Sequence, residues 1–259
     1  YISGTTVGGL FGRLVVSAIT DFVSWRMGLI VIGILYLAVG IAFFMLLPKP
    51  KYQRQRQSGG LQLIKTFHTA LANKKLLWIY LVAFLIMGSF VAVFNFISYV
   101  LLAPPYSLSQ TVVGLLFVVY LFGTFSSTYM GRLSDQHGNG RVLILGLLIM
   151  LTGGLLTLLQ PLVFKFIGLA IFTFGMLGSH SVACGWVGKL NQGDKAQSSS
   201  MYMFFYYAGA SSLGTLGGVF LESYGWSGVI GMVAAAVIIC LLVVVRLELA
   251  VSQHLLWHH

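Results

Sequence analysis

The sequence has very few charged residues, and acidic residues are the scarcest of them. Of its 259 residues, 8% are charged and only 5 are Asp or Glu, whereas 58% are hydrophobic. A soluble domain carries about a quarter charged residues, because its surface has to face water. This composition excludes an ordinary water-soluble fold and leaves lipid as the solvent for most of the surface.

Cysteine and proline are also scarce. The 2 cysteines, Cys184 and Cys240, both lie in apolar runs, and no disulfide or metal-ligand spacing surrounds them. The sequence therefore predicts no metal site, and it contains no motif that calls for a cofactor. The 5 prolines all lie between the apolar runs, which they leave uninterrupted.

The apolar runs are about 20 residues long and continuous, which is the length of a membrane-spanning helix. A membrane barrel would instead show shorter segments of alternating apolar and polar residues. The sequence therefore predicts an all-α, polytopic transmembrane helical bundle. The predicted spans are Tyr1–Thr20, Met27–Leu47, Leu76–Leu102, Thr111–Met130, Val142–Leu159, Phe166–Val187, Ser200–Leu221 and Ser227–Val245.

The basic residues lie almost entirely on one side of the predicted membrane. Of the 15 Lys and Arg residues, twelve fall in segments on one side, Arg26 and Lys165 lie on the other, and Arg13 lies within a span. The positive-inside rule places the basic side, with the central loop and the C-terminus, in the cytoplasm. The net charge of +10 thus orients the protein in a bilayer, and nucleic acid is not an expected partner. Part of the central loop, 61–71, is a candidate amphipathic helix on the membrane surface.

Two spans carry the same glycine spacing. Gly4, Gly9 and Gly12 in the first span are matched by Gly209, Gly214 and Gly217 in the seventh, and a tryptophan opens the span that follows each. The offset of 205 residues fits a six-span repeat joined by a long central loop, as in carriers built from two parallel six-span halves.

Two motifs resemble those of the major facilitator superfamily. Its cytoplasmic loop motif, G-x-L-x-D-x-x-G-R-K-x-x-L, is matched by Gly131, Leu133, Asp135, Gly138 and Leu143, with Asn139 and Gly140 in place of Arg-Lys and with Arg141 one place later. The antiporter motif of its fifth span, G-x-x-x-G-P-x-x-G-G, is matched by Gly4, Gly8 and Gly12, with Gly9 in place of the proline and Arg13 in place of the last glycine.

This resemblance implies eight of the twelve spans of the major facilitator fold, with the first four missing from the start of the chain. Residues 1–47 would then be the last two spans of the N-terminal half, 48–75 the cytoplasmic central loop, and 76–259 the C-terminal half and tail. The likeness is to bacterial inner-membrane efflux carriers that exchange solute for protons. A monomer is expected.

Several residues are candidates for coupling or gating. Gly4, Gly8 and Gly12 form a flat helix face, which serves either simple close packing or a sliding contact between helices. Asp135 in the Gly131–Arg141 turn either pairs with Arg132 or Arg141 as a conformational latch or lies in an ordinary solvated turn. Arg13 and His180 are polar residues deep in spans.

Arg13 is costly at that depth unless a partner or a function compensates for it. No acidic residue lies mid-span in this chain, so its partner is a missing helix, a backbone carbonyl or the substrate. His180 is either a proton carrier or a buried neutral side chain that hydrogen-bonds a neighbouring helix.

A solute site needs convergent polar groups on an aromatic background. The candidates are Asn95 and Tyr99, one helical turn apart, Tyr202 and Tyr206 on a second helix, and Tyr120 on a third. Each tyrosine has an alternative role in helix packing or at the membrane interface.

We therefore expect a secondary active transporter, proton-coupled, that exports a small sugar-like or amphipathic drug-like solute. The alternatives are a proton-symporting uptake permease and a non-transporting receptor or scaffold. An intramembrane enzyme is not expected, because it would need clustered His, Asp or Glu residues at one membrane face, and His137 with Asp135 is the only such pair in the sequence.

Overall fold

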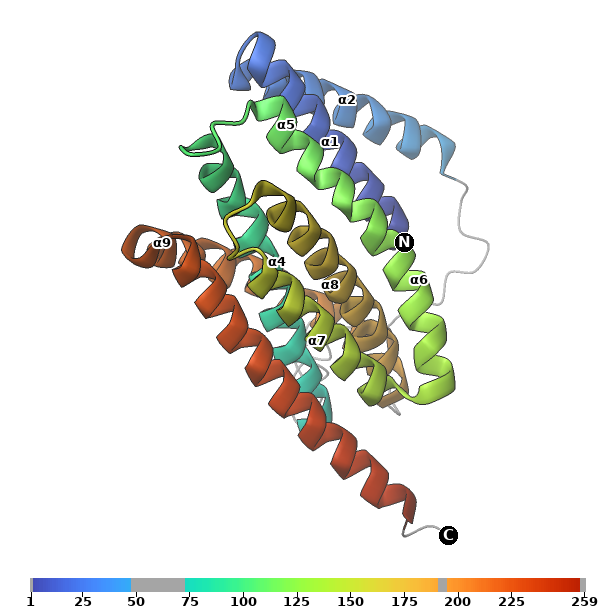
Figure 1. Ribbon diagram of the computed structural model, residues 1–259. Coiled ribbons are helices and arrows are strands. Elements are labelled where there is room, and N and C mark those ends of the chain that lie inside the picture. Colours follow the sequence, from blue (N-terminus) through green and yellow to red (C-terminus); the bar gives the residue numbers. More distant parts are fainter. Residues whose placement is uncertain (1, 48–72, 191–194, 257–259) are drawn as a thin grey trace.

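The computed structural model describes residues 2–47, 73–190 and 195–256, and all regular structure in these ranges is helical (Figure 1). The predicted all-α fold class is confirmed, and the predicted surface helix at 61–71 lies outside the described residues. The elements are α1 Ile2–Phe22, α2 Trp25–Leu46, α4 Lys74–Leu102, α5 Gln110–Leu115, the 3-10 helix η1 Leu116–Val119, α6 Tyr120–His137, α7 Asn139–Leu156, α8 Leu162–Leu190 and α9 Lys195–Leu256.

Polar side chains fix where several helices begin. The Ser24 hydroxyl accepts a hydrogen bond from Met27 N at the start of α2, and Asn73 Oδ1 accepts from Lys75 N at the start of α4. Ser109 caps α5 in the same way. Each cap binds an N–H group that the first turn of a helix leaves without a backbone partner.

The helices match the predicted spans, with two differences in continuity. Residues Gln110–His137 form one membrane-length run through α5, η1 and α6, and α9 contains the last two predicted spans, joined at Gly225. Gly225 has φ 65° and ψ −157°, a conformation that glycine adopts far more readily than other residues. Within the described residues, 6 helices are long and apolar enough to cross a membrane.

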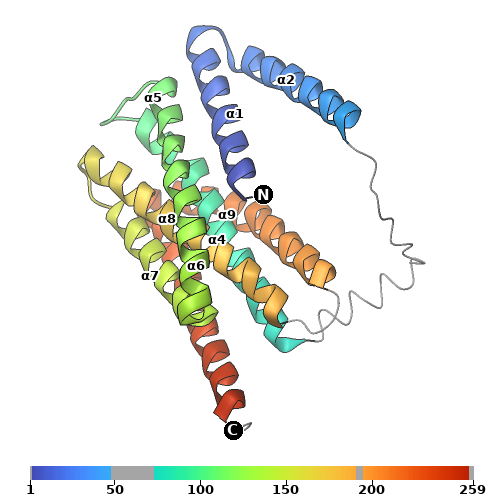
Figure 2. The ribbon, with the colours of Figure 1, turned by 90° about the vertical axis from the view of Figure 1, so that its right-hand side faces the viewer.

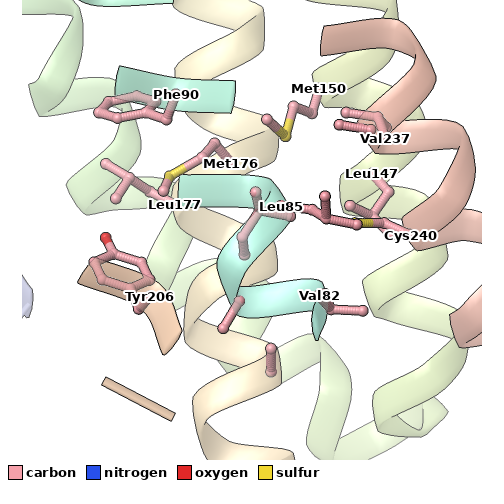
Figure 3. Packing of buried hydrophobic residues seen from close by; sticks show 14 of the residues in the cluster. Val82, Leu85, Phe90, Leu147, Met150, Met176, Leu177, Tyr206, Val237 and Cys240 are labelled. Atoms are coloured by element: carbon pink, nitrogen blue, oxygen red, sulfur yellow. The ribbon is translucent and has the colours of Figure 1, made fainter. Parts of the chain in front are cut away.

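The core lies among α4, α7, α8 and α9. Buried side chains from these four helices interdigitate there (Figure 3). Glycines bring α7 and α8 into backbone contact: a Cβ on Gly153 would lie 2.7 Å from the Gly168 carbonyl oxygen, and one on Gly175 would lie 2.7 Å from that of Gly146. These four glycines leave no room for side chains at the contact.

Helix α1 lies against α5 and α6, and α2 lies outside α1 (Figure 2). Apart from Gly28 and Ile32, the described residues of α2 are largely exposed and apolar. We call the end of the bundle with the α1–α2 turn the first end. The end with the α6–α7 turn is the second end.

Candidate functional site

Arg13 of α1 binds two aromatic residues of the α5–α6 run. Its Nη1 donates a 2.7 Å hydrogen bond to Tyr120 Oη, and its guanidinium lies 4.6 Å from the centre of the Phe117 ring. Arg13 is exposed, whereas Phe117 and Tyr120 are buried. The structure thus brings together two of the predicted site residues, Arg13 and Tyr120, from helices more than 100 positions apart in sequence.

A cluster of aromatic rings holds Tyr120 in place. Its ring centre lies 5.0 Å from that of Phe94, 5.4 Å from that of Phe90 and 5.6 Å from that of Phe117. Phe90 also stacks on Phe172 at 6.2 Å. Ring pairs prefer offset-stacked or edge-to-face geometry. Packing against these rings fixes the position of the Tyr120 ring and therefore the direction of its hydroxyl.

The α5–α6 run changes helix type beside Arg13. Residues Leu116–Val119 form a 3-10 turn in the middle of the run, and Tyr120 follows it directly. A 3-10 stretch inside a longer helix has poorer hydrogen-bond geometry and often marks a hinge. The residues that hold the guanidinium therefore lie within and next to the least regular part of this span.

Among the side chains that the structure describes, α1 contacts the α5–α6 run toward the first end. Asp21 accepts hydrogen bonds from Gln110 N at 3.1 Å, from Thr111 N at 2.6 Å and from the Thr111 hydroxyl. One turn further along, Ser17 lies against Gly114, where an added Cβ would be 2.6 Å from the Ser17 Cβ.

Beyond Arg13, two described glycines of α1 have open space beside them. An added Cβ on Gly8 or Gly9 would meet no atom of the structure within 4 Å. Among the described side chains, the helices thus touch at Asp21, Ser17 and Arg13, and no neighbour lies at the Cβ positions of Gly8 and Gly9. Gly12 lies next to the Tyr36 hydroxyl of α2, and Gly4 lies in the first part of α1.

His180 forms a second buried polar group with two predicted binding residues. Its Nδ1 lies 2.9 Å from Tyr202 Oη in a hydrogen bond whose donor depends on the histidine tautomer. The Tyr206 ring lies 4.4 Å from the His180 ring, and all three side chains are buried. The cluster joins α8 to α9.

Asn95 and Tyr99 lie together on an exposed part of α4. Tyr99 is 65% exposed, and its ring lies 6.2 Å from that of Phe96. Asn95 is exposed one turn away. In the described part of the chain, neither side chain hydrogen-bonds to Tyr120, Tyr202 or Tyr206, so the candidate solute residues form three separate groups.

The α6–α7 turn holds the loop motif. Gly138, with φ 92°, ends α6, and Asn139 begins α7. Asp135 pairs with Lys189 of α8 at 3.1 Å, and Lys189 also donates to Asn139 Oδ1 at 3.1 Å. The expected partners of Asp135, Arg132 and Arg141, are not the ones found, because the last turn of α8 brings Lys189 beside this turn.

The motif turn also receives a side chain from α9. An added Cβ on Gly140 would clash with the carboxylate of Glu248, which lies against the first turn of α7. A carboxylate near a helix N-terminus is favourable because the first N–H groups carry partial positive charge. Gly131 lies in α6, where an added Cβ would be 3.5 Å from the Ser181 hydroxyl oxygen. Arg141 is exposed.

Comparison with known proteins decides the family. The family model described as the Major Facilitator Superfamily matches residues 1–103 and, separately, residues 89–254. The chain belongs to the major facilitator superfamily. The predicted family is thereby confirmed, as is the helical bundle fold, and the chain is an integral membrane protein of a transporter superfamily.

Relatives within this superfamily come from several bacteria. The chain is 41% identical over 243 residues to the uncharacterized MFS-type transporter YybF of Bacillus subtilis, an alignment that covers 93% of this chain and 60% of YybF. It is 41% identical over 248 residues to the inner membrane transport protein YnfM of Escherichia coli, an alignment that covers 96% of this chain and 60% of YnfM.

An uncharacterized transporter of Buchnera aphidicola is 36% identical over 248 residues, with 96% of this chain and 60% of the relative covered. The chain thus spans about 60% of the length of these curated relatives. None of these names states a solute.

Three contacts of this superfamily member were not predicted from its sequence. Phe117 beneath Arg13, Thr111 opposite Asp21 and Lys189 opposite Asp135 were all missed. The basic–aromatic and acid–hydroxyl pairings are chemically ordinary, but the partners are 104, 90 and 54 positions apart. Only the α8 pairing carried a signal, since Lys189 lies on the same predicted side as Asp135.

Proposed function

We propose that the protein is a secondary active transporter that works by alternating access and exports a small organic solute in exchange for protons. One observation carries this proposal: among the described side chains, α1 touches the α5–α6 run from Asp21 to Arg13, whereas an added Cβ on Gly8 or Gly9 would meet no atom within 4 Å. A contact closed toward one end and open toward the other is what a rocking carrier needs between its halves.

The division into halves is part of the proposal. Residues 1–47 belong to one six-span half, 76–259 to the other, and 48–75 connect them. The glycine repeat and the membership of the superfamily support this assignment. The α1 glycines, Gly4, Gly8, Gly9 and Gly12, then form the sliding face. The motif residues Gly131, Asp135 and Gly138, with Lys189 as the partner of Asp135, form a latch at the second end.

Orientation and location follow from the charges. The second end carries Lys74, Lys75, Arg132, Arg141 and Lys189, and the first end carries Arg26 and Lys165. By the positive-inside rule the second end and the C-terminus are cytoplasmic. A bacterial inner membrane is proposed, because the relative YnfM is named an inner membrane transport protein. The carrier is proposed to act as a monomer.

Proton exchange is testable in proteoliposomes that contain the complete gene product. An imposed pH gradient and a panel of sugars and amphipathic compounds are applied, and internal pH and solute are measured together. We expect one solute class to move opposite to protons. Movement of both in the same direction would replace export by proton-symport uptake, and a folded protein that moves no solute across the panel would contradict a carrier.

The Asp21 contact is expected to hold the first end closed. The hydrogen bond from the Thr111 hydroxyl lowers the pKa of the Asp21 carboxyl below its ordinary value of 3.8, and the N–H groups of Thr111 and Gln110 add to the lowering. Asp21 lies beyond the predicted span. Because the pKa is lowered in the contact, the stabilisation is complete above pH 3.8 and is lost only as pH falls through the lowered pKa. The contact therefore does not titrate near neutral pH.

Asp21→Asn removes the charge and is expected to open this end. Ser17→Cys reports the opening, because Ser17 lies in the contact with Gly114. We expect a membrane-impermeant maleimide to label Ser17→Cys faster when Asp21→Asn is also present. The matched control is Glu222→Gln, an exposed acidic residue near the Gly225 break at the same end. Equal labelling of Ser17→Cys with and without Asp21→Asn would contradict the closing role of Asp21 at the first end.

A further inference from the structure

Arg13 carries a charge at a depth where lipid cannot solvate it. It lies nine residues before Phe22, the last residue of α1, which is about 13 Å along the helix axis. The described acidic side chains are engaged or placed elsewhere: Asp21 binds the start of α5, and Asp135 pairs with Lys189. Glu248 lies beside Gly140, and Glu222 lies near the Gly225 break.

The groups that hold Arg13 are electrically neutral. Tyr120 supplies a hydroxyl oxygen and Phe117 supplies the face of its ring. An aromatic face attracts a cation but does not cancel its charge. Among the described residues, the guanidinium therefore keeps a full positive charge. It has five N–H donors in a planar fork, and one hydrogen bond to Tyr120 does not use them all.

Tyr120 adds a second donor beside the guanidinium. Its oxygen accepts from Arg13, so its own hydroxyl hydrogen is available to donate. The ring cluster of Phe90, Phe94 and Phe117 fixes this hydroxyl, and a preorganised site loses less entropy when a ligand binds. A rigid hydroxyl next to a charged fork is a recognition site for an oxyanion.

The pair also lies where a solute can reach it. Arg13 is exposed, and an added Cβ on Gly9 or Gly8, which lie further along α1 toward the second end, would meet no atom within 4 Å. An anion bound there would contact both helices. We propose that Arg13 and Tyr120 form an anion-binding site, and that the exported solute carries a carboxylate or a similar oxyanion next to an aromatic or apolar body. This rests on the proposed carrier function, whose solute class it names.

The test measures binding rather than transport. The complete gene product is placed in nanodiscs of zwitterionic lipid and titrated with phenylacetate, its neutral amide phenylacetamide and the cation phenethylamine. These probes share one ring and differ in charge. We expect phenylacetate to bind at least about 10-fold more tightly than the other two, the scale of one charge-assisted hydrogen bond.

The variants identify the residues. Arg13→Gln is expected to remove the preference for phenylacetate, Tyr120→Phe to reduce it several-fold, and Arg13→Lys, which keeps the charge, to retain part of it. Arg26→Gln is the matched control, since Arg26 is also an α1–α2 region arginine over an aromatic ring, that of Trp25. Arg26→Gln is expected to leave the preference for phenylacetate unchanged. Partial preference in Arg13→Lys would show that the loss in Arg13→Gln does not come from a folding defect.

Three outcomes would overturn the proposal. The first is equal binding of the three probes by the folded protein, and the second is a preference that survives in Arg13→Gln. The third is a preference that vanishes when phosphatidylglycerol is added, since lipid phosphate would then be the natural occupant. Failure of the carrier function is separate: anion-selective binding without solute movement would contradict transport, whereas Arg13-independent export of neutral solutes would contradict the anion site alone.

Discussion

Gly209→Ala is expected to destabilise the protein by at least about 1–3 kcal/mol, the range for overpacking a tight core. An added Cβ would clash with the Phe84 carbonyl group, lying 2.6 Å from its carbon. The opposing Gly88 is equally close, because its own Cβ would lie 2.6 Å from the Gly209 carbonyl oxygen. The atoms that meet at this contact belong to the main chains of α4 and α9, so the clash cannot be relieved by a change of side-chain rotamer. Reversible unfolding in mixed SDS micelles, followed by tryptophan fluorescence, measures the loss.

Gly185→Ala is the matched control. Gly185 is an exposed glycine of α8, and an added Cβ meets no atom of the structure within 4 Å. Alanine there is expected to be neutral or to stabilise by up to about 1 kcal/mol through helix propensity. If Gly209→Ala unfolds no more easily than Gly185→Ala, the α4–α9 contact is not as tight as the geometry states.

The His180–Tyr202 pair is expected to show strong energetic coupling. His180→Phe removes the 2.9 Å partner of the fully buried Tyr202 hydroxyl, which keeps only a long, 3.5 Å hydrogen bond to the backbone carbonyl of residue 180; the expected cost is about 1–3 kcal/mol. Tyr202→Phe does the same to His180 Nδ1. Because the double variant leaves no unpaired polar group, we expect it to be more stable than the sum of the single losses by about 0.5–3 kcal/mol. The same unfolding assay completes the double-mutant cycle.

The double variant also distinguishes the two roles that the sequence leaves open for His180, a proton carrier and a buried neutral packing residue. Its packing is preserved by two rings of similar size, so a change in transport is not explained by unfolding. If His180 carries protons, solute exchange across proteoliposomes should persist while solute-driven proton movement disappears. Unchanged proton movement would leave His180 as a packing residue whose polar tip is satisfied by Tyr202.

Much of the helix layout was predictable because lipid imposes simple rules on sequence. An apolar run of about 20 residues has to form a helix in a bilayer. The prolines at Pro104 and Pro105 mark the end of α4, and the predicted break before Ser227 appears at Gly225. The 3-10 turn at Leu116–Val119 was not predictable, since Leu-Phe-Val-Val contains neither glycine nor proline.

The site was predictable in its residues but not in its contacts. Arg13 was identified by the cost of its charge and Tyr120 by its polar tip, yet nothing in the sequence pairs them. Periodicity shows which residues share a helix face, whereas a contact such as Asp21 with Thr111 depends on how two helices are rotated and offset. The predicted partner of Asp135 was wrong for the same reason. Proximity in sequence favoured Arg132 and Arg141, whereas the fold brings Lys189 of α8 within 3.1 Å of Asp135.

The glycine contact between α7 and α8 has a mechanical consequence. The two helices touch backbone to backbone at Gly146, Gly153, Gly168 and Gly175, so they cannot slide past each other without a clash between their main chains. They therefore move together as one rigid unit. Movement within the bundle has to occur at helix contacts that are made by side chains, because side chains can change rotamer. The contact between α1 and the α5–α6 run, where Arg13 binds the Phe117 ring and the Tyr120 hydroxyl, is of that kind.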